Sequence, residues 1–348
     1  MDISHEGNGK KRDALVDLAR IVAIFMIIIG HTSIRTAPNP GCCAELNILH
    51  RLDGDVVNPV CFFFFFAGYF AKKTGRLFAW GRAGQLVLST CLWSLVGYVV
   101  FHFLCSAEHY FHTHEFLAWK PLSLYQIVGD LASDVVPGHM DLWFMKVLIP
   151  IVFISSLLTR VPGWVLAILS LACLWLGDFL ETSAYDGLPY FLQQSSLSGM
   201  GCFSAGMLIR RFVPLPMLSS FVSKMALWYF VLMFIHSAVA LVIPYHVFRI
   251  PVLGVFLEML YFLSIAELVK RYMPGSQRLA RYGTAVFFVY VMQEFLIVGA
   301  NVLFTYFPIN RHLYTLVPFV VLLLCLLLYE VAQRVLPTRI RKIVCLQS

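Results

Sequence analysis

The chain has 348 residues, of which 59% are hydrophobic and only 13% are charged. A soluble domain carries about 25% charged residues, and the mean hydropathy here is +0.78, so this composition excludes an ordinary soluble protein. The net charge of +7 would suit a nucleic-acid partner, but the basic residues are spread along the ends of apolar runs. We therefore expect an all-α, polytopic membrane protein with no nucleic-acid partner.

Apolar runs bounded by charged residues, Pro or Gly predict ten membrane spans. A run of about 17 to 25 such residues crosses the hydrocarbon layer as one helix. The sixth run is the weakest because three glycines dilute it, and close helix packing would explain these small residues. The Phe62–Phe66 run is expected to pack against lipid and neighbouring helices. The expected spans are 18–34, 56–71, 85–105, 142–159, 163–180, 195–211, 225–244, 250–269, 284–307 and 313–333.

The distribution of Lys and Arg predicts the orientation of these spans. With the N-terminus in the cytoplasm, the inner segments carry 19 of them and the outer loops carry 5. This bias follows the positive-inside rule and places both termini in the cytoplasm. Anionic lipids of the inner leaflet account for the surplus charge. We expect one domain over 1–348, with a short polar lead at about 1–16 and a basic cytoplasmic tail at about 334–348.

The first span carries two polar side chains at the ends of an apolar stretch, Arg20 and His31. Eleven residues of α-helix make three turns plus about 20° and rise about 16 Å, so the two side chains share one face. Asp17 lies on the same stripe. Ionisable groups inside a membrane are costly and point to function. The alternatives are a snorkelling anchor for Arg20 and an interfacial, water-facing position for His31.

Five segments resemble sequence motifs of the membrane acyltransferase family 3, and they occur in the same order as in that family. "DLARIVAIFMIIIGH" resembles its first-helix signature of Arg or Lys, ten residues and His. "CFFFFFAGYF" is similar to its Phe-rich second helix, with Ala67 in place of the usual Ser. The family's motifs in the fourth, sixth and ninth spans are resembled by "GHMDLWFMKVLIP", "GCFSAGMLIRR" and "TAVFFVYVMQEF", respectively.

Two positions depart from the family pattern. The family's motif in the ninth span is commonly Tyr-x-x-His, whereas here Tyr290 is followed three positions later by Gln293. The family also has an Arg-x-x-Arg motif after the second span, and here Arg82 keeps its first position while Gln85 replaces the second arginine. The first change removes a second titratable group, and the second removes one candidate phosphate contact. Neither change touches Arg20 or His31.

The resemblance implies transfer of an acyl group, usually acetyl, from cytoplasmic acyl-CoA to a hydroxyl of an extracytoplasmic or lipid-linked glycan. The anionic nucleotide end of CoA should stay at the basic inner face, where Arg residues bind phosphate bidentately. The residues expected at this acyl-donor site are Asp17, Arg20, Lys73 and Arg82, with Lys72 and Arg76 also available. The pantetheine arm would then thread along the face shared by Arg20 and His31.

His31 is the expected catalytic residue. A neutral imidazole can take the proton of the acceptor hydroxyl as a general base, and an acyl-imidazole intermediate is the other possibility. Acyl-CoA is then a co-substrate, with acetyl-CoA as the expected donor, and no permanently bound cofactor or metal is expected. Three histidines lie in segment 109–116, but their spacing matches no strong zinc motif.

The acceptor is expected to approach from the outer side. The residues expected to contact the acceptor or the transition state are His139, Asp141, Trp143, Gln293 and Glu294. Trp143 has the alternative role of an interfacial belt residue, and Glu294 that of a structural partner for Lys146.

Two other function classes remain open from the sequence. Intramembrane charges and glycines also suit a transporter or flippase of a glycan or small anion. Gln293 and Gln85 would suit a degenerate member that senses acyl-CoA or a glycan. For the enzyme we expect a multi-pass location in a bacterial inner or plasma membrane, with envelope-biosynthesis proteins as partners.

Overall fold

The computed structural model describes residues 13–35, 59–73, 75–110, 142–182, 194–242, 251–306 and 311–346. Their regular structure is helical, which confirms the predicted all-α class for this part of the chain. Each of the ten predicted spans coincides with a helix. These helices are α1 (Ala14–Arg35), α3 (Pro59–Tyr69), α4 (Trp80–Tyr110), α6 (Trp143–Leu158), α7 (Gly163–Thr182), α8 (Gln194–Phe212), α9 (Leu215–Val242), α10 (Pro251–Tyr272), α12 (Val286–Tyr306) and α13 (Val317–Val335).

Four short helical pieces complete the described fold. Two of them, α11 (Ser276–Ala280) and the 3-10 turn η5 (Arg281–Thr284), join α10 to α12. The turn η6 (Arg311–Leu316) leads into α13, and α14 (Thr338–Val344) follows it.

Six of the described helices are long and apolar enough to cross a membrane: α1, α4, α7, α9, α12 and α13. The apolar helices α3 and α6 are shorter, with 11 and 16 residues. The protein is therefore an integral, multi-pass membrane protein with six candidate spans. The full number of ten and the cytoplasmic location of both termini stay predictions.

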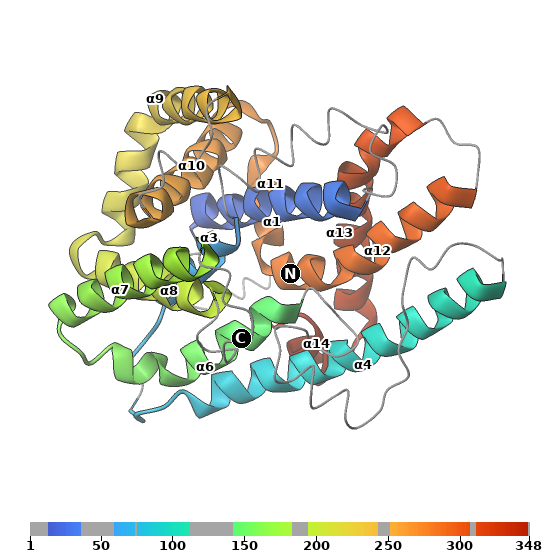
Figure 1. Ribbon diagram of the computed structural model, residues 1–348, viewed down its shortest axis with the longest axis horizontal. Coiled ribbons are helices and arrows are strands. Elements are labelled where there is room, and N and C mark those ends of the chain that lie inside the picture. Colours follow the sequence, from blue (N-terminus) through green and yellow to red (C-terminus); the bar gives the residue numbers. More distant parts are fainter. Residues whose placement is uncertain are drawn as a thin grey trace, which may run out of the picture.

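Helix α1 is the central element (Figure 1). It packs on α3, α10, α12 and α13, and its first turns also contact α11 and η5. In α1, 67% of the apolar stretch that is long enough to cross a membrane is buried inside the protein, whereas the corresponding share is 22% in α7 and in α9. The outer helices instead expose large apolar side chains, such as Trp175 and Trp228, as a lipid-facing surface does.

Helices α3 and α8 touch through their backbones. A Cβ atom at Gly68 would lie 1.9 Å from the Phe203 carbonyl oxygen, and one at Gly206 would lie 2.0 Å from the Phe65 carbonyl oxygen. Only glycine allows this approach. The close packing expected for the glycine-rich sixth segment is therefore confirmed. Arg210 then donates from Nη1 to the Tyr69 and Ala71 carbonyl oxygens, at 3.0 and 2.8 Å, and caps the end of α3.

The phenylalanine run of α3 lies inside the protein. Phe62, Phe64, Phe65 and Phe66 are each 0–3% exposed. Phe62 meets the ring of Phe262 on α10, with 5.2 Å between centroids. Neighbouring helices rather than lipid cover these four rings, so the expected lipid contact is wrong for them. The contacts of Gly68 with Phe203 and of Gly206 with Phe65 bring α8 against one side of the helix, and α10 covers Phe62.

The basic C-terminal tail docks on the bundle. Ser89 Oγ donates to the Ile343 carbonyl oxygen at 2.9 Å, and Trp93 Nε1 donates to the Val344 carbonyl oxygen at 3.2 Å. These bonds from α4 satisfy the carbonyl groups that end α14. Cys345 is consequently 1% exposed, and burial raises the pKa of its thiol to about 11.

The α3–α8 crossing can be tested with Gly206→Ala. The added methyl group would meet backbone atoms that have no rotamer to change, so the helices must separate. Overpacking costs about 1–3 kcal/mol even where side chains can yield. We expect a clear drop in the apparent melting temperature of the detergent-purified protein, measured by tryptophan fluorescence.

The matched control is Gly254→Ala on α10, where an added Cβ has no atom within 4 Å. It should be neutral or slightly stabilising, because alanine favours the helix by about 1 kcal/mol over glycine. Equal melting temperatures for the two variants would contradict the backbone contact.

Candidate active site

The first part of the site is an ion pair near the start of α1. Arg20 Nη1 donates to Asp17 Oδ1 at 3.0 Å, and the two side chains are 29% and 7% exposed. The guanidinium also lies over the ring of Phe70, 5.6 Å from its centroid. Each partner compensates the desolvation of the other. Both predicted donor-site residues of α1 are thus held together, next to the segment that follows α3.

Gly283 of η5 makes room for this ion pair. A Cβ atom there would lie 2.5 Å from Asp17 Cβ and 2.6 Å from Asp17 Oδ1. The carboxylate of Asp17 therefore lies directly on the backbone of η5. Sequence analysis did not select Gly283, although a glycine just before the ninth apolar run was a visible signal.

The second part of the site lies at the other end of α1. His31 is half-buried, and its Nδ1 lies 3.1 Å from Nε2 of Gln293 on α12. Gln293 is 0% exposed. The structure thus brings together two predicted site residues that are 262 positions apart in the chain. The residue that departs from the family pattern is the one in contact with the expected base.

Apolar side chains fill the α1 face between the two parts. Ile24 and Ile27 lie between Arg20 and His31 on the same helical stripe, and they are only 1% and 3% exposed. They belong to an apolar cluster that also contains Ile21, Ile28, Leu86, Val152 and Val289, and we call this cluster the α1 barrier. The stripe between Arg20 and His31 is therefore covered by neighbouring side chains, so a pantetheine arm that follows it must displace apolar contacts.

A cavity of about 390 Å³ opens between the end of α3, the start of α4 and the middle of α6. This volume is within the usual range for small-molecule sites. We call it the basic cavity, because three cationic side chains line it among mostly apolar ones. The lining residues are Ala67, Ala71, Lys72, Arg76, Phe78, Ala79, Trp80, Gly81, Arg82, Leu86, Leu148, Val152, Ser155 and Phe203.

Helix α6 holds the segment that forms one wall of the basic cavity. Ser156 Oγ donates to the Arg76 carbonyl oxygen at 2.6 Å, and the Ala79 N–H donates to the Phe153 carbonyl oxygen at 2.9 Å. The ring of Phe78 stacks on that of Phe153, with 4.8 Å between centroids. Backbone hydrogen bonds and ring stacking on α6 therefore hold the wall that carries Lys72, Arg76 and Arg82.

The structure sorts the predicted basic residues into two groups. Arg82 lines the basic cavity, with Lys72 and Arg76. Lys73 is exposed and is not among the lining residues. Arg20 is not among them either; it contacts Phe70, which directly precedes the lining residue Ala71. Leu86 and Val152 line the cavity and also belong to the α1 barrier, so the cavity wall is continuous with the apolar cluster that contains Ile24 and Ile27.

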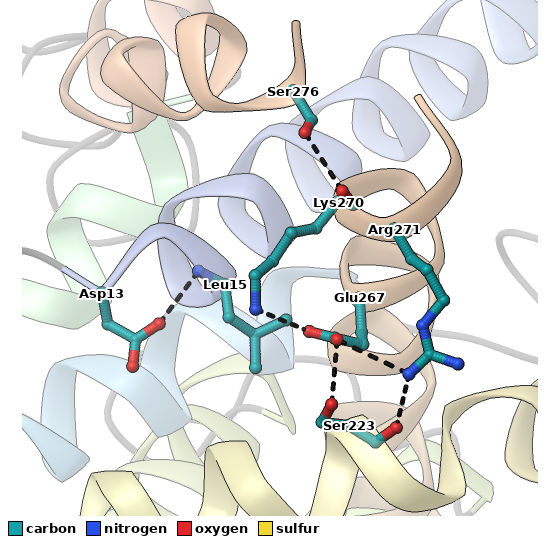
Figure 2. A network of polar contacts seen from close by, with 7 residues as sticks. All are labelled: Asp13, Leu15, Ser223, Glu267, Lys270, Arg271 and Ser276. Carbon is teal, nitrogen blue, oxygen red and sulfur yellow. Dashed lines mark hydrogen bonds and ion pairs between the residues drawn. The ribbon is translucent and has the colours of Figure 1, made fainter. Parts of the chain in front are cut away.

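A second group of charges serves the packing of α9 on α10 (Figure 2). Glu267 is 4% exposed and accepts hydrogen bonds from Ser223 Oγ and Lys270 Nζ, both at 3.1 Å. Arg271 Nη2 lies 3.7 Å from Glu267 and donates to the Ser223 carbonyl oxygen at 2.7 Å. Figure 2 also shows Asp13, whose carboxylate accepts from the Leu15 N–H at 2.9 Å and caps the start of α1.

The expected acceptor residues are only partly described. His139 and Asp141 lie outside the described residues. Trp143 is half-buried at the start of α6, and Glu294 is 2% exposed on α12. In the part of the chain that the structure describes, no three His, Cys, Asp or Glu side chains gather as metal ligands would. Trp143 and Glu294 stay predictions as acceptor contacts.

Fold and site together define an integral-membrane protein with a histidine and an ion pair on its central helix. The chain matches the family model of the acyltransferase 3 family, described as an acyltransferase domain, over residues 13–330, and it belongs to this family. No curated protein and no solved structure matches the chain. Family membership makes the protein a membrane acyltransferase, with an acyl donor as co-substrate and an acceptor.

The packing of the Asp17–Arg20 ion pair against the backbone of η5 can be tested with Gly283→Ala. The new methyl group would displace the Asp17 carboxylate and leave Arg20 without its 3.0 Å partner. Losing a hydrogen bond between charged groups costs about 1.5–3 kcal/mol, which corresponds to roughly ten- to hundredfold in an equilibrium constant. We expect the KM for the acyl donor to rise by about tenfold or more.

Gly254→Ala is again the matched control, and circular dichroism of both variants should show unchanged helix content. A Gly283→Ala protein with the wild-type KM would mean that the position of Asp17 does not matter for the donor.

Proposed function

We propose that this protein is an O-acyltransferase that moves an acyl group, most simply acetyl, from cytoplasmic acyl-CoA to a hydroxyl of an extracytoplasmic or lipid-linked glycan. The observation that carries the proposal is a basic cavity whose wall is continuous with the apolar cluster on α1, the helix that also carries His31. Family membership supports the reaction type. The proposed location is a bacterial inner or plasma membrane, where envelope-biosynthesis proteins would supply or use the glycan.

The basic cavity is the proposed site for the anionic end of the acyl donor. Lys72, Arg76 and Arg82 provide cations for phosphate groups, and the Trp80 ring offers a surface on which a base can stack. This choice revises the expected donor set, because Lys73 lies outside the lining. Arg20, with Asp17 beside it, would contact the donor at the cavity edge, next to Phe70.

The α1 barrier would determine which end of the donor approaches His31. A pantetheine arm is thin and largely neutral, so it can enter packed apolar side chains where phosphates cannot. From the cavity floor at Leu86 and Val152, the arm would displace Ile24 and Ile27 to bring its thioester to His31. Water is excluded from such a path, which protects the thioester from hydrolysis.

At His31 the proposed reaction is a direct transfer. The imidazole takes the proton of the acceptor hydroxyl while the oxygen forms a bond to the thioester carbonyl carbon. The C–S bond then breaks, and the sulfur leaves as the CoA thiol with the proton that His31 had taken. Transfer through an acyl-imidazole is the alternative, with His31 itself forming the first bond.

The proposed acceptor contacts are His139, Asp141, Trp143 and Glu294; of the two that the structure describes, Trp143 begins α6 and Glu294 lies in the middle of α12. An aromatic ring suits the apolar face of a sugar, and carboxylates accept its hydroxyl groups. A transporter or flippase would use intramembrane charges in a similar way, but the family match is to an acyltransferase domain. The sensor alternative keeps donor binding without transfer, so the experiments below distinguish it.

His31→Ala tests the chemical step. Removing a general base lowers the rate by about 10²- to 10⁴-fold. We expect the purified variant in lipid to lose the transfer of labelled acetyl from acetyl-CoA to a glycan hydroxyl. Mass spectrometry of the glycan measures this transfer. Binding of the donor should remain. Undiminished transfer by the folded variant would overturn the role of His31, and glycan movement across vesicles without any acylation would favour the transporter.

Arg76→Gln with Arg82→Gln tests the donor site. Each lost charged contact to phosphate costs about 1.5–3 kcal/mol, so the KM for acyl-CoA should rise by roughly a hundredfold. The rate at saturating donor should change little. The matched control is Arg278→Gln, an exposed arginine of α11 that does not line the cavity. An equal KM for the double variant and the control would place the donor elsewhere.

A further inference from the structure

We infer that Arg210 is a positioning residue of the acyl-donor site: it holds the peptide group that leads into Lys72 and so fixes this cation at the wall of the basic cavity. The inference rests on the proposed function, because it assigns a role in donor binding at that cavity. Arg210 itself is not among the lining residues, so its role is indirect.

The first observation is the bond from Arg210 to the segment after α3. Nη1 of Arg210 donates to the carbonyl oxygens of Tyr69 and Ala71, at 3.0 and 2.8 Å. The Ala71 carbonyl group and the Lys72 N–H belong to one planar peptide group. Ala71 and Lys72 both line the basic cavity. A guanidinium that restrains this peptide group therefore restrains the point from which the Lys72 side chain extends.

The second observation is that the ends of α3 and α8 restrain each other. Tyr69 Oη donates to the Val213 carbonyl oxygen at 2.8 Å, while Arg210 donates to the Tyr69 carbonyl oxygen. One turn before Arg210, on the same face of α8, Gly206 lies against the backbone of Phe65. The guanidinium is therefore presented from a helix whose position relative to α3 is already fixed.

The charge of Arg210 suits this place for a further reason. The last carbonyl groups of a helix carry a partial negative charge of about half an elementary charge. The end of α3 lies at the basic cavity, because Ala67 and Ala71 line it. Such a helix end would repel the phosphate groups of a donor. Arg210 brings positive charge to two carbonyl oxygens there and so makes the cavity more favourable for an anion.

The neighbouring arginine makes similar bonds in a different place. Arg211 Nη2 donates to the carbonyl oxygens of Thr159 and Val161, at 3.4 and 2.7 Å, just after the end of α6. Neither Thr159 nor Val161 lines the basic cavity. Arg210 and Arg211 are both exposed. The two arginines therefore separate the general effect of bonding a helix end from an effect on the cavity.

The test compares Arg210→Gln with Arg211→Gln. Each replacement removes a cation and its bonds to two carbonyl oxygens, so we expect similar, modest decreases in the apparent melting temperature. Only Arg210→Gln should weaken donor binding. Its KM for acetyl-CoA should rise about threefold to tenfold, the range for one ordinary hydrogen bond, with kcat unchanged. Calorimetric titration with CoA should show the same factor in Kd, which measures binding without the reaction.

Limited proteolysis measures the restraint on the segment directly. Lys72 and Lys73 are exposed, so trypsin can cleave after either of them when the backbone opens locally. Cleavage at these two positions should be faster in Arg210→Gln than in the wild type or in Arg211→Gln. Mass spectrometry of the fragments identifies the cleaved bonds.

Equal donor KM, equal CoA Kd and equal cleavage rates for the two glutamine variants would overturn the inference. If Arg210→Gln does not fold, Arg210→Lys decides, with Arg211→Lys as its control. A flexible ammonium group restrains two carbonyl oxygens less than a planar guanidinium does, so the same changes should appear at smaller size.

Failure of the proposed function gives a different result. In that case the double variant Arg76→Gln with Arg82→Gln keeps the wild-type donor KM. If only the present inference fails, that double variant shows its raised KM while the Arg210 variants match their Arg211 controls.

Discussion

Polar side chains on the central helix can stay in an apolar interior because another residue lies within bonding distance of each. Arg20 has Asp17 at 3.0 Å, and His31 has Gln293 at 3.1 Å. These partners impose conditions on the rest of the fold. The η5 backbone must carry a glycine where Asp17 lies on it, and α12 must pack on α1 in the register that brings Gln293 to the ring. A buried charge or imidazole without such a partner would cost several kcal/mol.

The same packing separates the two ends of the proposed reaction. In the proposed reaction the phosphate groups bind the cations of the basic cavity, and the transferred group passes the apolar side chains of the α1 barrier to reach His31. Ile24 and Ile27 are buried, so the barrier opens only by a rearrangement of apolar side chains. An apolar arm can bring about this change, since it replaces the contacts that it displaces. Selection for a donor with a long neutral arm would then follow from the barrier itself.

Charge at the predicted cytoplasmic side is divided between structure and binding. Lys270 and Arg271 surround the buried carboxylate of Glu267, and Arg210 caps α3. The segment that carries Lys72, Arg76 and Arg82 is held on α6 by backbone contacts, and these three residues line the cavity that we propose for the donor. Counting basic residues on one side of the membrane therefore predicts orientation but not ligand binding.

The sequence by itself determined the helices and the spacing along each of them. Apolar runs placed a helix at all ten expected segments, and the 3.6-residue period put Arg20 and His31 on one stripe of α1. These properties are local, because a helix satisfies its backbone within its own residues. Only the tertiary structure decided that Gln293 faces His31, that Arg76 lines the cavity while Lys73 does not, and that Ile24 and Ile27 close the stripe. These outcomes depend on the register between helices, which is set by the summed packing of many side chains and by backbone approaches such as that of Gly68 to Phe203.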